Sequence, residues 1–128
     1  MLDEAIALVR TFQQCAGQPA VGKPIMADAE RVRTRIKWIT DELEEYWGAE
    51  TIYEQADALI DTLYYLLGAF VDSGIAADRL FEIVHRSNMR KVSPDVTIVQ
   101  ADDSKIEKPA DWTHPDLEIE SEINRQMG

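Results

Sequence analysis

Cysteine, long apolar runs and basic residues near the start are all scarce in this sequence of 128 residues. The one cysteine, Cys15, excludes a disulfide within the chain and favours a reducing compartment. We therefore expect a cytoplasmic protein, in the host cytoplasm if it is viral. No apolar run reaches the roughly 18 residues of a membrane-spanning helix. The acidic start, MLDEAIALVR, also lacks the basic region of a signal peptide.

Positive charge is scarce along the whole chain. Against 24 Asp and Glu there are 13 Lys and Arg, which gives a formal net charge of −11. A surface of this sign repels the phosphates of nucleic acids and anionic lipid headgroups. We expect neither nucleic acid nor a membrane among the partners.

Glycine, proline and alternating strand patterns are sparse through the middle of the chain, where apolar residues instead recur at helical spacing. Hydrophobic residues make up 45% of the chain, enough for the core of one domain. The pattern predicts helices at 3–15, 28–47, 51–72 and 77–88, with Asp3 as a candidate N-cap. We therefore predict an all-α fold with an antiparallel four-helix bundle as its core.

Residues 92–128 are expected to form an extended C-terminal arm that wraps the body. This part mixes prolines and acids with one short apolar run, 96–99, and it is expected to end in a short helix near 115–124. The whole chain, 1–128, is predicted to be a single domain.

Three apolar stripes are expected to pack inside the bundle. On the second helix the stripe consists of Val32, Ile36, Ile39, Leu43 and Tyr46. On the third it consists of Ile52, Ala56, Leu59, Leu63, Leu66 and Phe70. On the fourth it consists of Leu80, Phe81 and Val84.

Residues 41–61, DELEEYWGAETIYEQADALID, hold eight carboxylates and neither lysine nor arginine. At helical spacing, Glu42 and Glu45 share one face, and the acids of the next helix, Glu54, Asp57 and Asp61, share another. Antiparallel packing lets these faces meet, where the carboxylates repel unless a cation compensates them. Mg²⁺ or Mn²⁺ prefers such oxygen ligands. The simpler interpretation is an acidic face in contact with solvent.

A second cluster, HRSNMRK at 85–91, gathers basic residues at the end of the fourth helix. Cations there complement the helix dipole, which is a sufficient structural reason for them. The functional alternative is a clamp for phosphate oxygens, with Asn88 as a polar ligand.

These segments resemble the MazG-like, all-α nucleoside triphosphate pyrophosphohydrolases, which are related to the dimeric dUTPases and to phosphoribosyl-ATP pyrophosphohydrolase. WITDELEEYW resembles the first acidic motif and EQADALIDTLYYLLG the second. GIAADRLFEIVHRSNMRK and KPADWTHPDLE resemble later segments of a subgroup found in bacteria and phages. The likeness covers about residues 5–118.

The resemblance implies cleavage of a nucleotide between its α and β phosphates, from dNTP to dNMP and pyrophosphate, with two or three Mg²⁺ or Mn²⁺ ions. Glu42, Glu45 and Asp61 match the metal ligands of the family. In that register Ala58 stands where glutamate is expected, and Asp57 is the substitute. The register Glu54-x-x-Asp57 satisfies the motif literally, so both registers stay open.

Further roles also follow from the resemblance. Asp41 and Glu42 are the expected catalytic residues, with Asp41 orienting the attacking water. Asn88 and Lys91 match the phosphate-contacting pair, with Arg86 as a third candidate.

The base pocket is indicated only weakly. Phe12, Trp38 and Trp47 are candidates for stacking on a base, and both purines and pyrimidines stay open. Because so few helices rarely cover their own apolar faces, a homodimer or homotetramer is expected.

Two other classes of protein fit parts of the pattern. A non-catalytic helical module that dimerises or binds a partner would have the same apolar stripes. A di-iron carboxylate bundle needs two Glu-x-x-His motifs. Only one is present, Glu82-x-x-His85.

Overall fold

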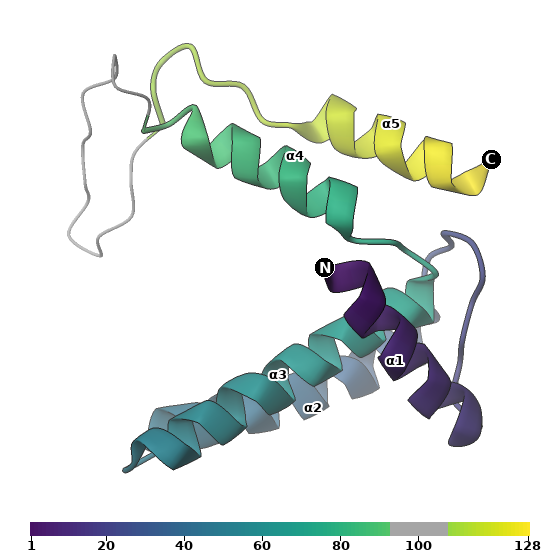
Figure 1. Cartoon of the computed structure of the whole chain (residues 1–128), viewed down its shortest axis with the longest axis vertical. Helices are drawn as coiled ribbons and strands as arrows, with labels where there is room; N and C mark the ends of the chain where they lie inside the picture. The colour runs from purple at the N-terminus through teal and green to yellow at the C-terminus, as the bar shows by residue number, and fades with distance from the viewer. Residues whose placement is uncertain (93–107) are drawn as a thin grey trace.

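The computed structural model describes residues 1–92 and 108–128, and every regular element in these ranges is an α-helix. The five described helices are α1 (Leu2–Cys15), α2 (Ala29–Gly48), α3 (Ile52–Ser73), α4 (Asp78–Met89) and α5 (Asp116–Met127) (Figure 1). The all-α prediction is confirmed, and the first four helices begin and end within one residue of their predicted bounds. The predicted apolar run at 96–99 lies outside the described residues.

Local capping explains both ends of α3. Thr51 is the N-cap, and its side-chain oxygen accepts a hydrogen bond from the backbone N–H of Glu54 at 3.1 Å. The Glu54 carboxylate in turn accepts from the N–H of Glu50 at 2.8 Å. At the other end, Gly74 adopts a φ of 66°, a left-handed conformation that glycine reaches without a steric penalty.

The first turns of α1 and α4 cap each other. Asp78 accepts hydrogen bonds from the backbone N–H groups of Leu2 and Asp3, at 2.7 and 3.2 Å. Asp3 accepts from those of Ala77 and Asp78, at 2.6 and 3.2 Å. The prediction that Asp3 caps its own helix is therefore wrong, because the N-cap of α1 is Met1. The capping carboxylate comes from a residue far away in sequence, which a local pattern does not reveal.

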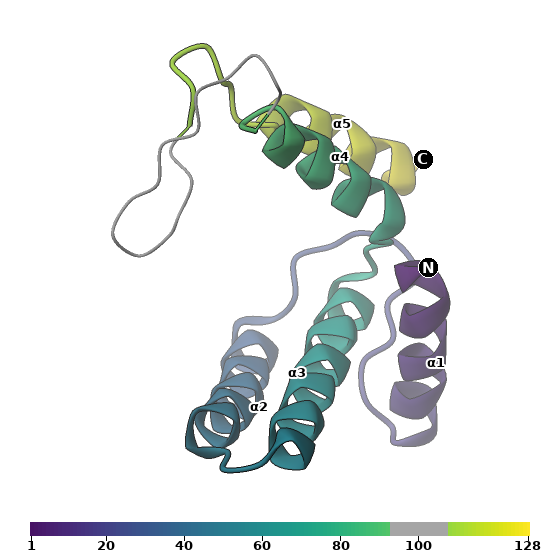
Figure 2. The ribbon, with the colours of Figure 1, turned by 60° about the vertical axis from the view of Figure 1, so that its left-hand side comes forward.

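Helices α1, α2 and α3 pack together, while α4 packs mainly against α5 (Figures 1 and 2). The buried apolar cluster consists of Ile6, Val9, Leu67, Val71 and Ala77, so the core lies between α1 and the C-terminal half of α3. The chain bends by 117° between α3 and α4. The predicted fourth helix of the bundle thus leaves the other three and pairs with α5.

The apolar stripes predicted to fill the core are largely exposed in this chain, which corrects the sequence-based expectation. Ile36 on α2 is 58% exposed and Leu59 on α3 is 52% exposed. Phe81 and Val84 on α4 are also exposed, whereas Ile83 and Ser87 are buried there. A different stripe of α2, shifted by one residue, faces α3.

In the described ranges, no single helix combines the length and hydropathy needed to cross a membrane. Helices α3 and α4 meet that test only as a pair, bent at their junction.

Candidate active site

The predicted acidic residues meet around Glu42, on the face of α2 that lies against α3. The Oε2 atom of Glu42 is buried and accepts no hydrogen bond from any described group. Burial raises the pKa of Glu42 from 4.5 to about 7, helped by a side-chain hydrogen bond with Glu45. The negative charges of Glu45, Asp61 and Asp57 raise this pKa further. The structure therefore brings Glu45, Asp57 and Asp61 close enough to Glu42 to oppose the ionisation of Glu42.

A cavity of about 320 Å³ lies at the turn between α2 and α3, where Glu45, one helical turn after Glu42, is part of its lining. Its lining consists of Glu45, Gly48, Ala49, Glu54 and Asp57. Asp41 is exposed, and its carboxylate lies 3.2 Å from Nζ of Lys37. Glu54 is partly engaged by its hydrogen bond from Glu50. The turn thus combines an open space with several acidic side chains.

The carboxylates around Glu42 are the candidate ligands of a divalent ion. No three His, Cys, Asp or Glu side chains in the described ranges are arranged to hold one as they stand. The donor set fits a hard cation nonetheless, since every charged group that shifts the pKa of Glu42 is a carboxylate. Glu45 and Asp57 are exposed, so their side chains have room to turn toward an ion. The buried oxygen of Glu42 without a partner is the kind of atom that a cation satisfies.

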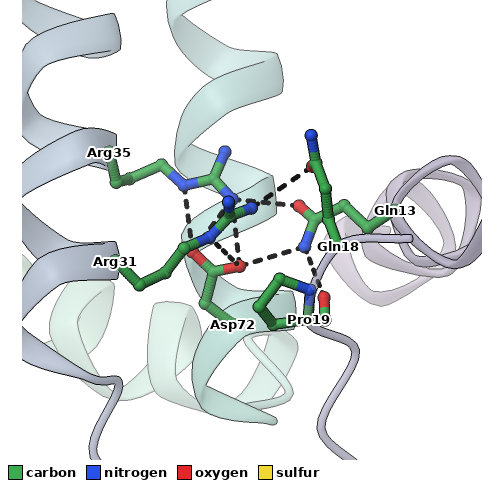
Figure 3. A network of polar contacts seen from close by, with 6 residues as sticks. All are labelled: Gln13, Gln18, Pro19, Arg31, Arg35 and Asp72. Carbon is green, nitrogen blue, oxygen red and sulfur yellow. Dashed lines mark hydrogen bonds and ion pairs between the residues drawn. The ribbon is translucent and has the colours of Figure 1, made fainter. Parts of the chain in front are cut away.

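A buried network of ion pairs lies further along the interface between α2 and α3, which we call the seam (Figure 3). Arg35 is 6% exposed and Asp72 is 5% exposed, and their side chains are 2.9 Å apart at Nη2 and Oδ2. Arg31 Nε lies 3.2 Å from Asp72 Oδ1 as an ion pair without hydrogen-bond geometry. Gln13 donates to Asp72 at 3.0 Å and to the Pro19 carbonyl at 2.7 Å. The network joins α1, α2 and α3 at one buried carboxylate.

The network also holds an aromatic pocket in place. The guanidinium carbons of Arg31 and Arg35 each lie 5.2 Å from the ring centre of Trp38, which stacks on Tyr65 at 5.6 Å. A cavity of about 270 Å³ beside these rings is lined by Val9, Phe12, Gln13, Gln18, Arg35, Trp38, Tyr64 and Tyr65. The structure thus places the predicted Phe12 and Trp38 in one pocket. Trp47 is 92% exposed and does not line it.

The predicted phosphate-contacting residues lie on another part of the chain. Asn88 and Arg86 are near the end of α4, followed by Lys91, whose Nζ donates to Asn88 Oδ1 at 3.0 Å. Arg86 is exposed and lies 3.8 Å from Glu118 of α5. Asp61 precedes the end of α3 by 12 residues, or about 18 Å along the helix. Since α4 then leads away from that end (Figure 1), one chain does not bring these residues to the carboxylates.

Sequence reasoning missed the buried network and the tyrosines of the pocket. Arg31, Arg35, Trp38, Glu42 and Glu45 recur at spacings of four, three, four and three, the same rhythm as the apolar stripe one residue later. On α3 a matching series consists of Ala58, Asp61, Tyr65, Gly68 and Asp72. The helical spacing of these residues is visible in the sequence. Because most of them are polar or charged, the pattern does not predict that they face the interior.

This chain is similar to one protein family and to solved structures. The family model of phosphoribosyl-ATP pyrophosphohydrolase matches residues 9–88. A crystal structure from Exiguobacterium sp. 255-15, named there a "putative NTP pyrophosphohydrolase", is 27% identical, with 93% of each chain covered and a TM-score of 0.51. No curated protein matches the chain. The matched range, 9–88, includes α2, α3, every predicted metal ligand and the aromatic pocket.

Proposed function

This chain belongs to the phosphoribosyl-ATP pyrophosphohydrolase family, and we propose that it hydrolyses a nucleoside triphosphate between the α and β phosphates. The proposed substrate is a deoxynucleotide, the products are dNMP and pyrophosphate, and the role is control of the nucleotide pool in a bacterium or phage. In this reaction a water oxygen bonds to phosphorus, the bond to the bridging oxygen breaks, and pyrophosphate leaves.

The observation that carries the proposal is the environment of Glu42. Burial is the largest cause that raises the pKa of Glu42 to about 7, and the neighbouring carboxylates of Glu45, Asp61 and Asp57 raise it further. A cluster with a purely structural purpose would gain from basic partners, but no cation contributes to this shift. A carboxylate whose pKa is raised by burial and by neighbouring carboxylates is typical of a functional site.

The proposed metal ligands are Glu42, Glu45, Asp57 and Asp61, for two or three Mg²⁺ or Mn²⁺ ions. Such ions, when bound, neutralise phosphate charge and make water more nucleophilic. Glu54 suits the role less well because its carboxylate accepts a hydrogen bond from the N–H of Glu50, and it is not among the acids that raise the pKa of Glu42. These two facts support the register Asp57/Asp61 over Glu54/Asp57.

Asp41 and Glu42 are the proposed catalytic residues. The pKa of Glu42 near neutrality suits a group that exchanges a proton with water at physiological pH. Asp41 is exposed beside it, and Lys37 holds its carboxylate on the surface of α2. We propose that Asp41 orients the attacking water.

The base is proposed to enter the aromatic pocket between α1 and the α2–α3 seam. Trp38 precedes Glu42 by one helical turn and Tyr65 follows Asp61 by one turn, so the pocket and the carboxylates are neighbours along the seam. Phe12 lies edge-on to Tyr64 at 5.8 Å and supplies another aromatic wall. A base stacked there would place its phosphates toward the carboxylates around Glu42.

We propose that the working protein is a homodimer or homotetramer. The exposed stripes of α2 and α3 are too apolar for a surface that stays in water. A second copy packed on them would also explain how Asn88, Lys91 and Arg86 reach carboxylates that their own chain holds far away. The proposed site is then completed by α4 of a neighbouring copy.

Pyrophosphate release from the eight common nucleoside triphosphates, with Mn²⁺, tests the activity and reads the base preference. The wild type is expected to release pyrophosphate, and Glu42→Gln to lose at least about 100-fold in kcat/KM, as is usual for removal of a general base or metal ligand. Glu44→Gln is the matched control, because Glu44 is exposed on the same helix. In ¹⁸O-labelled water, label is expected in only one of the two products.

Three results would count against this function. Orthophosphate as the only product would point to another reaction, and label in both products would exclude a single attack on one phosphorus. A wild type that releases nothing from any of the eight nucleotides would favour the non-catalytic helical module.

A further inference from the structure

The aromatic pocket beside Trp38 also has polar groups in its lining, and the buried network fixes how they are turned. The cavity has a volume of about 270 Å³, near the lower end of the range of about 300–1,000 Å³ for small-molecule sites. That size suits a single nucleobase rather than a whole nucleotide. Two amides and one guanidinium line it, those of Gln13, Gln18 and Arg35. Their orientation determines which hydrogen-bonding pattern a base must offer.

Gln13, which is 1% exposed, has only one orientation that its neighbours allow. Its amide nitrogen donates to Asp72 Oδ1 at 3.0 Å and to the carbonyl of Pro19 at 2.7 Å, and both partners are acceptors. Its amide oxygen accepts from Nη2 of Arg35 at 3.1 Å, and a guanidinium can only donate. A flipped amide would oppose like groups on both sides. Both amide hydrogens of Gln13 are therefore used inside the network.

Gln18 is oriented by the same rule. Its amide oxygen accepts a hydrogen bond from Nη2 of Arg31 at 3.2 Å, so the oxygen must face the network. The amide nitrogen then lies on the other side and donates to no residue in the described ranges. Figure 3 shows this nitrogen turned away from Asp72, with no dashed line ending on it. Because Gln18 lines the cavity, it offers a free NH₂ donor there.

Arg35 supplies a second free donor. Its Nε and Nη2 atoms donate to Asp72 and Gln13, whereas Nη1 donates to no residue that the structure describes. In Figure 3 the terminal nitrogen of Arg35 without a dashed line points to the same side as the free nitrogen of Gln18. The residue is only 6% exposed, and buried polar groups nearly always have a partner. An N–H without an acceptor in the lining of a cavity is therefore a sign of a ligand.

Packing on Trp38 explains only part of this arrangement. The guanidinium carbon of Arg35 lies 5.2 Å from the ring centre of Trp38, a contact that stabilises the positive charge. That contact provides no acceptor in the ring plane for Nη1, and it leaves the free NH₂ of Gln18 unexplained.

The rest of the lining adds donors but no dedicated acceptor. No carboxylate is among the described residues that line the cavity, and the indole N–H of Trp38 can only donate. The hydroxyl groups of Tyr64 and Tyr65 can donate or accept, so they do not favour either kind of ligand. The cavity as a whole presents more donors than acceptors.

The charge of the network favours the same kind of ligand. Arg31 and Arg35 both pair with the one carboxylate of Asp72, so the described network has one more positive than negative charge. Positive charge beside a cavity attracts the partial negative charge of a carbonyl oxygen and repels the partly positive hydrogens of an amine.

Nucleobases differ in this group. Uracil and thymine have a carbonyl where cytosine has an amine, and guanine and hypoxanthine have a carbonyl where adenine has an amine. A carbonyl can accept from the free donors of this pocket. An amine at the same place would leave them unpaired, which is costly inside a protein.

We propose that this pocket selects nucleotides whose base carries an exocyclic carbonyl, with Nη1 of Arg35 and the amide NH₂ of Gln18 donating to the acceptor edge of the base. Uracil, thymine, guanine and hypoxanthine are then accepted, and cytosine and adenine are disfavoured. The inference rests on the function proposed above, because it requires that the base enters this pocket. Gln18 and Arg35 thereby determine the specificity of the site.

The test compares matched pairs of triphosphates, dUTP with dCTP and dITP with dATP, by calorimetry on the full chain. EDTA removes the metal that hydrolysis is proposed to need, and the phosphates are the same within each pair, so a difference in Kd reports the base. The carbonyl member of each pair is expected to bind at least about tenfold more tightly. Equal affinities within both pairs, or tighter binding of dCTP and dATP, would overturn the proposal.

Gln18→Glu exchanges the free donor for an acceptor. One carboxylate oxygen can keep the contact with Arg31, and the other then lies where the NH₂ was. The preference for dUTP over dCTP is expected to fall about tenfold or more. Gln14→Glu is the matched control, because it makes the same change at an exposed position of α1. Equal effects of the two variants on the Kd ratio would overturn the role of Gln18.

The place of binding is read from the indole N–H signals of the three tryptophans. Binding of dUTP is expected to shift the signal of Trp38, and an unmoved Trp38 signal would overturn the assignment to this pocket. The specificity and the enzymatic function fail separately. A carbonyl preference in binding, without hydrolysis when Mn²⁺ is added, would refute only the function. Hydrolysis of all four nucleotides with equal kcat/KM and equal Kd would refute only the specificity.

Discussion

At the scale of single residues, Glu42 links the candidate site to the stability of the fold. Its folded pKa of about 7 lies above the ordinary value of 4.5, so the folded protein binds more protons than the unfolded chain between these two values. The free energy of unfolding must therefore fall as the pH rises through that range. The carboxylates around Glu42 therefore lower the stability of the fold as the pH rises toward neutrality.

The first prediction concerns this pH dependence. In EDTA, the melting temperature is expected to fall between about pH 4.5 and pH 7, and Glu42→Gln is expected to reduce that fall. Thermal unfolding followed by circular dichroism at a series of pH values measures it, with exposed Glu44→Gln as control. If the melting temperatures of the wild type and Glu42→Gln depended on pH in the same way, Glu42 would not be the group with the raised pKa.

The second prediction concerns the metal. Because a dication competes with the proton on Glu42, Mn²⁺ is expected to raise the melting temperature of the wild type more at pH 8 than at pH 6. Glu42→Gln should lose most of this stabilisation. If Mn²⁺ stabilised the variant and the wild type equally, the ion would bind elsewhere.

Asp72 is the buried carboxylate that holds the ion network of Figure 3 together. Asp72→Asn keeps the shape of the side chain but leaves Arg35 buried without a counter-charge, which is expected to cost about 3–5 kcal/mol. Urea unfolding measures the loss, and Asp111→Asn, at an exposed position, is the control. A loss below about 1 kcal/mol would show that water enters the network.

At the scale of elements, the close packing of α2 on α3 depends on Gly68. A Cβ at Gly68 would lie 2.5 Å from Nη1 of Arg35 and 2.7 Å from Oε1 of Gln13. No such contact exists at Gly48, where a Cβ would meet nothing within 4 Å. The network of Figure 3 therefore needs glycine at position 68.

Gly68→Ala is expected to destabilise the protein by about 1–3 kcal/mol, because overpacking outweighs the better helix propensity of alanine. Weaker stacking of Trp38 on Tyr65 should accompany this, seen as a changed near-UV circular dichroism signal. Gly48→Ala is the matched control and should be tolerated. A Gly68→Ala protein as stable as the control would mean that the guanidinium moves aside without loss.

At the scale of the whole molecule, the separation of the carboxylates from α4 leads to a test by mixing. Glu42→Gln and Lys91→Ala damage opposite halves of the proposed site, and each is expected to be nearly inactive alone. In a dimer whose sites combine two chains, half of the randomly mixed dimers carry both variants and keep one intact site. An equal mixture should therefore recover about a quarter of wild-type activity.

Pyrophosphate release after mild unfolding and joint refolding measures this recovery. No recovery would mean that each site uses a single chain. Ile36→Glu places a charge in the exposed stripe of α2 and should prevent copies of the chain from associating there. The variant should sediment as a smaller species and should also lose activity.

The sequence alone determined the helices and the acidic motif. Periodicity, caps and glycine stops act within a few residues, which is why four pairs of helix bounds agree within one residue. The eight carboxylates at 41–61 could likewise be found from residue type and spacing. Of the three aromatic candidates suggested by residue type, Phe12 and Trp38 line one cavity, and Trp47 does not.

Only the tertiary structure decided which face of each helix is interior. On α2 two stripes one residue apart have the same helical period, so the pattern cannot choose between them. The choice depends on Asp72 and Gly68, which lie far away on α3 and accept the guanidinium of Arg35 inside the seam. The 117° bend after α3 is also a long-range outcome, because it follows from α4 pairing with α5 and from the mutual capping of Asp3 and Asp78.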